Sequence, residues 1–191
     1  MLPVRIPPAY KGISIRTIRF PQDVNDLIEI HQRNDYHPSW SLQPDTKTIE
    51  TFYRTFLDWS PYGAWLLSFR GTTMFLLELM PIDCTDIGQF YPAEPGDYSL
   101  GIKLNIGPDQ EEIATQTLLA AMEGILTANP ADIRRFIFPV SYNIPGSPLR
   151  NILGKAGFIV LKDQSEQGSP VIYELASSTL TTNPVNIISW K

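Results

Sequence analysis

Apolar and polar residues follow two different periods along the chain, and together they predict a mixed α/β protein. Residues 13–20, ISIRTIRF, alternate with a period of two, which is typical of a β-strand with one buried face. After Pro21, which ends this strand, the apolar spacing changes to i, i+3, i+4, i+7 and predicts a helix. The residues at these positions are Val24, Leu27, Ile28 and His31.

The same periods predict the remaining elements. In order, they are a helix over 44–59, two strands within 63–83 that form a hairpin around Arg70-Gly71, a strand over 97–107, a helix over 110–127, a strand over 134–140, a short helix over 147–157, and strands over 158–163 and 170–177. Asp45 or Thr46 is placed to cap the helix over 44–59. The tail from Ser177 is expected to be extended or loose.

The expected fold class is therefore α/β, with a central mixed, twisted sheet flanked by helices. No repeat and no linker divides the chain, so we expect a single domain over 13–177. Residues 1–12 would then form an N-terminal extension, and residues 178–191 a C-terminal tail.

Composition narrows the range of functions. The 191 residues carry a net charge of -5 and no basic run, which argues against a nucleic-acid partner. No apolar segment approaches the roughly 20 residues of a membrane span, so we expect no membrane partner. Cys84 is the only cysteine, which excludes an internal disulfide and fits a cytoplasmic protein. With two histidines and one cysteine, we expect no dedicated metal site.

Four segments resemble those of a known family. They are MFLLELMPID (74–83), PGDYSLGIKLNIG (95–107), FPVSYN (138–143) and NILGKAGF (151–158). Together with the element order, they resemble the GNAT acyltransferase superfamily, and more narrowly its branch that acylates hydroxylated amines during siderophore synthesis. The resemblance covers roughly residues 13–177.

The resemblance implies acetyl-CoA or another acyl-CoA as cosubstrate. The acyl-CoA would lie between a strand over 100–107 and its neighbour over 136–140, with its pyrophosphate on the turn after Gly107. The implied cofactor-binding residues are Leu104, Ile106, Gln110, Ile113, Ala114, Thr115 and Asn143. Asn143 is interpreted equally well as a turn residue before Pro145.

The turn after the cofactor strand departs from the family's pattern, Arg/Gln-x-x-Gly-x-Gly/Ala. Among residues 110–115 only Gln110 conforms. Ile113 places a branched side chain where the backbone should approach a phosphate. The general-acid tyrosine of many other GNAT enzymes would fall at Leu153, so it is absent too.

Charged positions depart from the family as well. Glu111 and Glu112 suit the start of a helix that Asp109 is expected to cap, because acidic residues complement the helix dipole. The same charges repel a pyrophosphate, so we expect acetyl-CoA to bind weakly or not at all. The family's histidine aligns with Lys103, and its motif glutamate aligns with Phe138.

Four residues are candidates for acid–base chemistry or for its structural surroundings. Glu78 lies in a very apolar strand, either half-exposed or buried, and is our first choice for a general base. Asp97 would bind a substrate amine, or else only solvate its loop. Lys103 would replace the family histidine only with a strongly lowered pKa, and the alternative is a solvent-facing lysine. His31 is interpreted as a histidine of the core.

The resemblance also implies an acceptor pocket. GNAT proteins shape this pocket from the loop between the first two helices, where His37 and Trp40 lie. Tyr91, in the long loop before the cofactor strand, would form its other wall. We expect Glu78 and Asp97 to converge on the same pocket.

The leading functional hypothesis is an acyl-CoA-dependent N-acyltransferase for a small-molecule amine or hydroxylamine, of the siderophore-synthesis type. The alternative is a GNAT-fold protein that has lost catalysis and serves as a binding or partner module, which the altered turn, Lys103 and Phe138 favour. A third hypothesis is an acyl carrier protein as donor, although the acidic sequence offers no obvious basic patch for it. A homodimer is a possible assembly.

Overall fold

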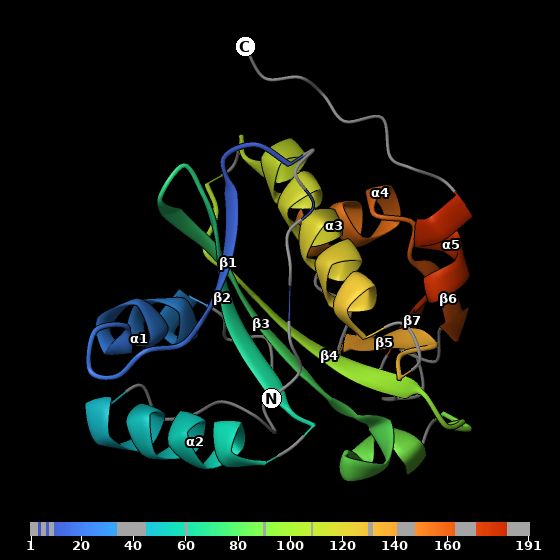
Figure 1. Ribbon diagram of the computed structural model, residues 1–191, viewed down its shortest axis with the longest axis horizontal. Coiled ribbons are helices and arrows are strands. Elements are labelled where there is room, and N and C mark those ends of the chain that lie inside the picture. The colour runs from blue at the N-terminus through green and yellow to red at the C-terminus, as the bar shows by residue number, and fades with distance from the viewer. Residues whose placement is uncertain are drawn as a thin grey trace.

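Figure 1 shows the protein as a computed structural model. The structure describes residues 4, 7, 10–33, 45–59, 61–89, 91–107, 109–129, 132–140, 148–162 and 171–182. Within these residues, seven strands form one sheet in the order β1-β2-β3-β4-β5-β7-β6. The β4–β5 pair is parallel and all other neighbours are antiparallel, so the predicted mixed sheet is confirmed.

The elements follow the predicted order. The strands are β1 Ile13–Thr17, β2 Gly63–Phe69, β3 Thr72–Pro81, β4 Asp97–Leu104, β5 Arg135–Val140, β6 Ile159–Lys162 and β7 Val171–Ala176. The α-helices are α1 Val24–Arg33, α2 Thr46–Asp58, α3 Glu111–Ala128, α4 Pro148–Lys155 and α5 Ser177–Thr182. Two 3-10 helices, η1 Ile82–Cys84 and η2 Asp86–Gln89, follow β3.

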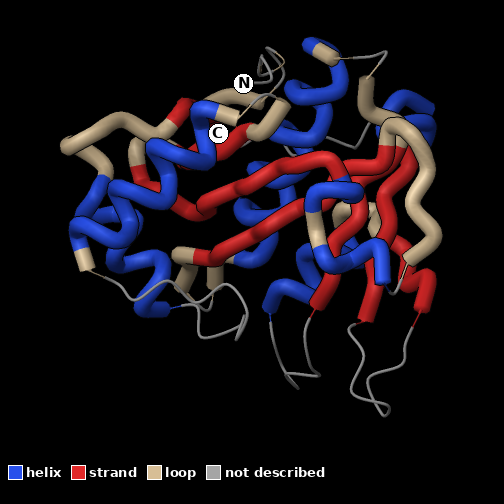
Figure 2. The backbone as a smooth tube through the Cα atoms, turned by 90° about the horizontal axis from the view of Figure 1, so that it is seen from below, coloured by secondary structure: helices blue, strands red, loops and turns tan. Residues whose placement is uncertain are grey.

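The helices cover both faces of the sheet (Figure 1), and the strands lie between them in the view from below (Figure 2). Helix α3, with α4 and α5, packs over the main hydrophobic core, and α1 and α2 pack over a smaller one. Strand β3 contributes to both: Leu77 points to the main core and Leu76 to the smaller one. A strand buried on both faces reads as a continuous apolar run, as MFLLELM does.

Strands β4 and β5 pair only at one end. Asp97 pairs with Arg135 and Ser99 with Ile137, and the pairing stops there, although β4 continues to Leu104 and β5 to Val140. On its other edge β4 stays paired with β3 along its length, up to Leu104. The two parallel neighbours therefore part toward their C-terminal ends.

Local signals in the sequence explain two of the boundaries. Arg70 and Gly71 have φ angles of 49° and 85°, which are those of the tight turn that a two-residue hairpin prefers. Asp45 caps α2, because its side chain accepts a hydrogen bond from the backbone N–H of Thr48. Of the two predicted caps, Asp45 is the correct one.

Described residues on both sides of the predicted domain pack onto its core. The prediction of an extended or loose tail from Ser177 is wrong for its first part, because α5 forms there and Leu180 is buried in the main core. In the predicted N-terminal extension, Tyr10 is buried and its hydroxyl donates to Glu123 of α3 at 2.7 Å. Burial of these two side chains draws both segments onto α3 and its surroundings.

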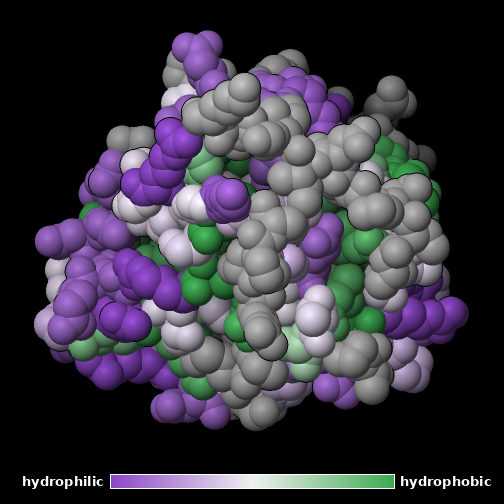
Figure 3. Space-filling model, turned by 45° about the horizontal axis from the view of Figure 1, so that its top comes forward, coloured by the Kyte–Doolittle hydropathy of each residue, from purple (hydrophilic) through white to green (hydrophobic). Residues whose placement is uncertain are grey.

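The described surface is mixed in character. Hydrophilic side chains cover much of the described surface that Figure 3 turns forward, with hydrophobic groups between them. Among the described residues, the exposed large hydrophobic side chains are Trp59, Ile159, Val160 and Leu161. Three of these belong to β6, the strand at one edge of the sheet, where self-association would be tested first.

Candidate active site

A buried charged group lies between the sheet and helices α1 and α2. Glu78, in the middle of β3, is only 2% exposed. Its Oε2 accepts a hydrogen bond from Lys103 Nζ of β4 at 2.9 Å, and its Oε1 accepts one from the Tyr53 hydroxyl of α2 at 2.5 Å. His31 Nε2 of α1 lies 2.9 Å from that hydroxyl. Four elements therefore contribute to one connected polar group, which we call the Glu78 network.

The charge states within the Glu78 network follow from these contacts. Burial alone would raise the pKa of Glu78, but Lys103, Tyr53 and His31 outweigh it, so the pKa lies below its ordinary value. Burial, with the positive charge of Lys103, lowers the pKa of His31 to about 4. At neutral pH the network therefore holds a carboxylate, an ammonium and a neutral imidazole.

Lys103 lies on the predicted strand but does not face solvent. Its side chain is 13% exposed, because the face of β4 that carries it is covered by α1. Within the described part of the chain Nζ bonds only Glu78, so two of its three N–H donors are not used there. The prediction of a solvent-facing lysine is wrong, and that of a core His31 is confirmed; of the two alternatives for Glu78, burial is the correct one.

Gly101 gives the Glu78 carboxylate its space. It pairs with Glu78 across β3 and β4. A Cβ at this position would lie 2.5 Å from Glu78 Oε2 and 3.2 Å from Glu78 Cβ. A larger residue would therefore push the carboxylate away from Lys103.

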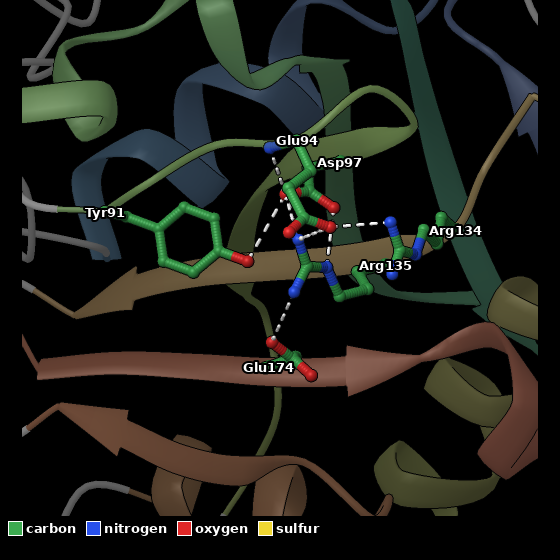
Figure 4. Close-up of polar contacts among 6 residues, drawn as sticks. All are labelled: Tyr91, Glu94, Asp97, Arg134, Arg135 and Glu174. Carbon is green, nitrogen blue, oxygen red and sulfur yellow. Dashed lines mark hydrogen bonds and ion pairs between the residues drawn. The ribbon is translucent and has the colours of Figure 1, made fainter.

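A second charged group lies where β4 and β5 are still paired (Figure 4). Arg135 Nε and Nη2 donate to the two carboxylate oxygens of Asp97, each at 2.7 Å. The same guanidinium is 3.1 Å from a Glu94 oxygen and 3.6 Å from a Glu174 oxygen. The Tyr91 hydroxyl donates to Asp97 Oδ2 at 3.3 Å. We call this group the Asp97 network.

The two networks lie apart along β4. Gly101, which pairs with Glu78, is four residues from Asp97 along β4, or about 13 Å at the usual rise of a strand. Asp97 accepts hydrogen bonds from Arg135 and from the Tyr91 hydroxyl, whereas Glu78 accepts from Lys103 and Tyr53, so these contacts do not support the expectation that Glu78 converges with Asp97 and Tyr91. His37 and Trp40 lie outside the described residues.

In the turn after β4, a side chain of the turn binds the turn's own backbone. The Gln110 amide oxygen accepts the backbone N–H of Gly107 at 2.8 Å. Gln110 is the N-cap of α3 and makes no side-chain cap bond, so the expected cap by Asp109 is wrong. Glu111 and Glu112 occupy the first turn of α3, as predicted.

Helix α4 partly neutralises the acidic start of α3. Lys155 Nζ lies 3.9 Å from a carboxylate oxygen of both Glu111 and Glu112. Asn151 Nδ2 approaches Glu111 at 3.4 Å. Ile113 packs against the main core, a placement that does not support the expected steric block of a phosphate.

The other implied cofactor residues are distributed around this turn. Leu104 ends β4 with its side chain buried in the main core, and Ile106 packs against the same core. Ala114 and Thr115 are buried in α3, where the Thr115 hydroxyl donates to the Glu111 carbonyl. Asn143 lies outside the described residues.

Sequence reasoning did not select Tyr53 or Arg135 as site residues, although each connects a network. Tyr53 lies among the buried residues of α2, so its spacing alone does not distinguish it from an ordinary core residue. A buried tyrosine needs a partner for its hydroxyl, and that rule was the available signal. Arg135 begins a buried strand, where an arginine also requires a carboxylate.

The described residues contain neither a candidate metal site nor a candidate membrane span. No group of three or more His, Cys, Asp or Glu side chains there could hold a metal ion. No described helix combines the length and the apolar character needed to cross a membrane.

Comparison with known proteins gives a structural answer. No family model and no curated protein matches the sequence. The aminoglycoside acetyltransferase AAC(6')-Ib in complex with ribostamycin and coenzyme A matches 92% of this chain and 99% of its own, with a TM-score of 0.73 and 12% identity. Spermidine N-acetyltransferase SpeG from Vibrio cholerae matches 91% and 99%, with a TM-score of 0.65 and 10% identity.

A third solved structure is similar at a slightly higher identity. It is an uncharacterized protein from Bacillus halodurans, which matches 88% of this chain and 86% of its own, with a TM-score of 0.69 and 18% identity. Such identities establish the fold alone. Together with the strand order and the parting of β4 from β5, they show that this chain has the GNAT acyltransferase fold.

Proposed function

We propose that the protein is an acyl-CoA-dependent N-acyltransferase for a small amine or hydroxylamine, of the siderophore-synthesis type. The observation that carries the proposal is the parting of β4 from β5 beyond Ser99 and Ile137. In the resembling family the acyl-CoA enters between these two strands. The similarity to an acetyltransferase solved with ribostamycin and coenzyme A over nearly its whole length supports this reading.

The donor would lie along the free part of β4. Its thioester and pantetheine would meet backbone near Leu104 and Ile106, and its pyrophosphate would approach the start of α3. The remaining proposed donor-side residues are Gln110, Ile113, Ala114, Thr115 and Asn143.

The acceptor nitrogen must be neutral when it attacks the thioester carbonyl. The C–N bond then forms, the C–S bond breaks, and the departing CoA thiolate takes up, directly or through water, the proton that the nitrogen loses. Glu78 is a poor receiver for that proton, since both of its oxygens accept hydrogen bonds and its pKa is lowered. Asp97 is likewise held by Arg135.

This distribution of charge favours a hydroxylamine over an alkylamine. The electronegative hydroxyl group makes a hydroxylamine nitrogen less basic, so that it is already neutral at physiological pH and needs less help from a base. Lys103, with Glu78 as counter-ion, would serve as a fixed cation. It would stabilise the negative charge that develops on the thioester oxygen.

The test measures binding and turnover separately. Calorimetric titration with acetyl-CoA and longer acyl-CoAs is expected to show one site, with a weak affinity because Glu111 and Glu112 stand at the start of α3. Thiol release is then followed with a matched pair, an N-hydroxyalkylamine and its parent alkylamine, and we expect faster release with the former. Absence of acyl-CoA binding would contradict the proposal.

A second function, a GNAT-fold binding module without catalysis, is favoured by the start of α3. There the Gln110 side chain already accepts the Gly107 N–H, which is then not available to a ligand. The carboxylates of Glu111 and Glu112 lie where the family binds a pyrophosphate. Acyl-CoA binding without thiol release from any acceptor, or no binding at all, would support this alternative.

A further inference from the structure

We propose that Tyr53 and His31 are positioning residues, which keep Glu78 ionised and thereby hold the Lys103 ammonium in place for the thioester oxygen of the proposed donor. The inference rests on the proposed function and explains how the position of Lys103 is maintained. It assigns a task to two side chains from helices α2 and α1, neither of which belongs to the cofactor strand.

The directions of the hydrogen bonds carry the first step. An ionised carboxylate only accepts, so the Tyr53 hydroxyl must donate its single proton to Glu78 Oε1. The hydroxyl oxygen can then only accept from His31, which must carry its proton on Nε2. The chain of donors runs one way, from His31 through Tyr53 to Glu78, and Lys103 donates to the other carboxylate oxygen.

Burial makes these donors irreplaceable by solvent. Tyr53 is 0% exposed, and Glu78 and His31 are also buried. The titratable groups that face Glu78 are His31 from α1, Tyr53 from α2 and Lys103 from β4, while β2 places Ala64 opposite it. The ionisation of Glu78 therefore depends on three side chains.

Loss of the Tyr53 hydroxyl has a defined consequence. Glu78 Oε1 would lose its donor and the pKa of the carboxyl would rise, because hydrogen bonds to the charged form favour it. A protonated Glu78 no longer neutralises Lys103, and the ammonium is then free to leave its place. The effect on turnover should therefore appear in kcat and at the acid side of the pH profile, with the KM for acyl-CoA unchanged.

The experiment compares Tyr53→Phe with wild type. Carbon-13 NMR of the Glu78 carboxyl is expected to show a pKa raised by about one pH unit, and the acid limb of the kcat profile should move by the same amount. The control is Tyr10→Phe, which removes a hydroxyl that donates to Glu123 on the opposite side of the sheet. It should leave the titration of Glu78 unchanged.

Variants of His31 test the remote end of the chain. His31→Gln keeps an N–H donor and should retain the wild-type pH profile of kcat. His31→Leu removes the donor and should shift this profile in the same direction as Tyr53→Phe. Thermal unfolding verifies that each variant is folded. An unchanged Glu78 titration in both folded Tyr53→Phe and folded His31→Leu would overturn the proposal.

The measurements distinguish an error in the proposed function from an error in the roles proposed for Tyr53 and His31. If the wild-type protein neither binds nor turns over acyl-CoA, the proposed function fails, and the NMR titration still measures whether Tyr53 and His31 hold Glu78 ionised. If turnover is present but its pH profile ignores Tyr53→Phe while the Glu78 titration moves, the positioning role in catalysis is overturned.

Discussion

At the scale of single residues, Glu78 on the neighbouring strand leaves no room for a side chain at Gly101. A Cβ there would meet Glu78 Oε2 at 2.5 Å, so Gly101→Ala should destabilise the fold by about 1–3 kcal/mol. Gly154 in α4 is the matched control, because a Cβ there meets nothing within 4 Å. Gly154→Ala should stabilise by about 0.5–1 kcal/mol, since alanine is the better helix former. Urea unfolding of both variants measures the contrast, and equal effects would refute it.

The Glu78–Lys103 pair should show the asymmetry of a buried ion pair. Lys103→Met leaves the carboxylate without its cation and should cost about 3–5 kcal/mol of unfolding free energy. Adding Glu78→Gln removes the stranded charge and should restore part of that loss. A double-mutant cycle by denaturant unfolding measures the coupling, and strictly additive effects would show that the two side chains do not depend on each other.

At the scale of elements, the start of α3 is expected to limit the affinity for the proposed donor. Glu111→Gln with Glu112→Gln removes two negative charges and frees Lys155 from both. Affinity for acetyl-CoA should rise roughly tenfold at low salt, and the gain should shrink as salt screens the charges. Titration of both proteins at two salt concentrations provides the measurement.

The control for this change is Glu50→Gln, which removes an acidic residue of α2 that pairs with Arg54. It should leave the affinity unchanged. Micromolar binding by the wild-type protein would show that the electrostatic argument about this turn is wrong, and it would strengthen the enzyme hypothesis.

Elements with a strong local signal were predictable, and α5 was not. The apolar spacing of α1 and the turn at Arg70-Gly71 are contained in a few neighbouring residues, and both were confirmed. The segment SSTLTT has mostly poor helix formers, and the burial of Leu180 in the main core, against residues distant in the sequence, stabilises it as a helix. Tertiary packing stabilises that helix, and the local sequence pattern does not reveal which distant residues will pack against it.

At the scale of the whole molecule, stability should fall on the acid side of neutrality. The folded protein keeps His31 neutral down to about pH 4, while the unfolded chain binds a proton there near pH 6.5. Between these values the unfolded state holds more protons, so stability falls as pH drops, by up to about 3 kcal/mol. The lowered pKa of Glu78 adds a loss at lower pH, as the carboxylate becomes protonated.

Denaturant unfolding from pH 7 to pH 4 tests this dependence. His31→Gln has no group that titrates in that range at this position, so its curve should be flatter than that of the wild type. Parallel curves for the two proteins would mean that His31 does not contribute the acid slope.

The candidate site was predictable as a set of residue types but not as a set of contacts. Glu78 and Lys103 were both selected from the sequence, and they are bonded to each other. Their partnership depends on the register of β3 against β4, and the burial of Lys103 depends on α1, which lies some seventy residues away in the sequence. Asp97 and Arg135 come together only because β4 and β5 pair.

The short β4–β5 pairing also has a mechanical consequence. In the described structure, three residue pairs join the two halves of the sheet, against seven between β3 and β4. We expect the two parts of the sheet, β1-β2-β3-β4 and β5-β7-β6, to move as separate rigid units that are joined near one end, where Arg135 binds Asp97. Load or thermal bending would be absorbed at the other end, where the spacing between β4 and β5 can change without breaking a strand pairing.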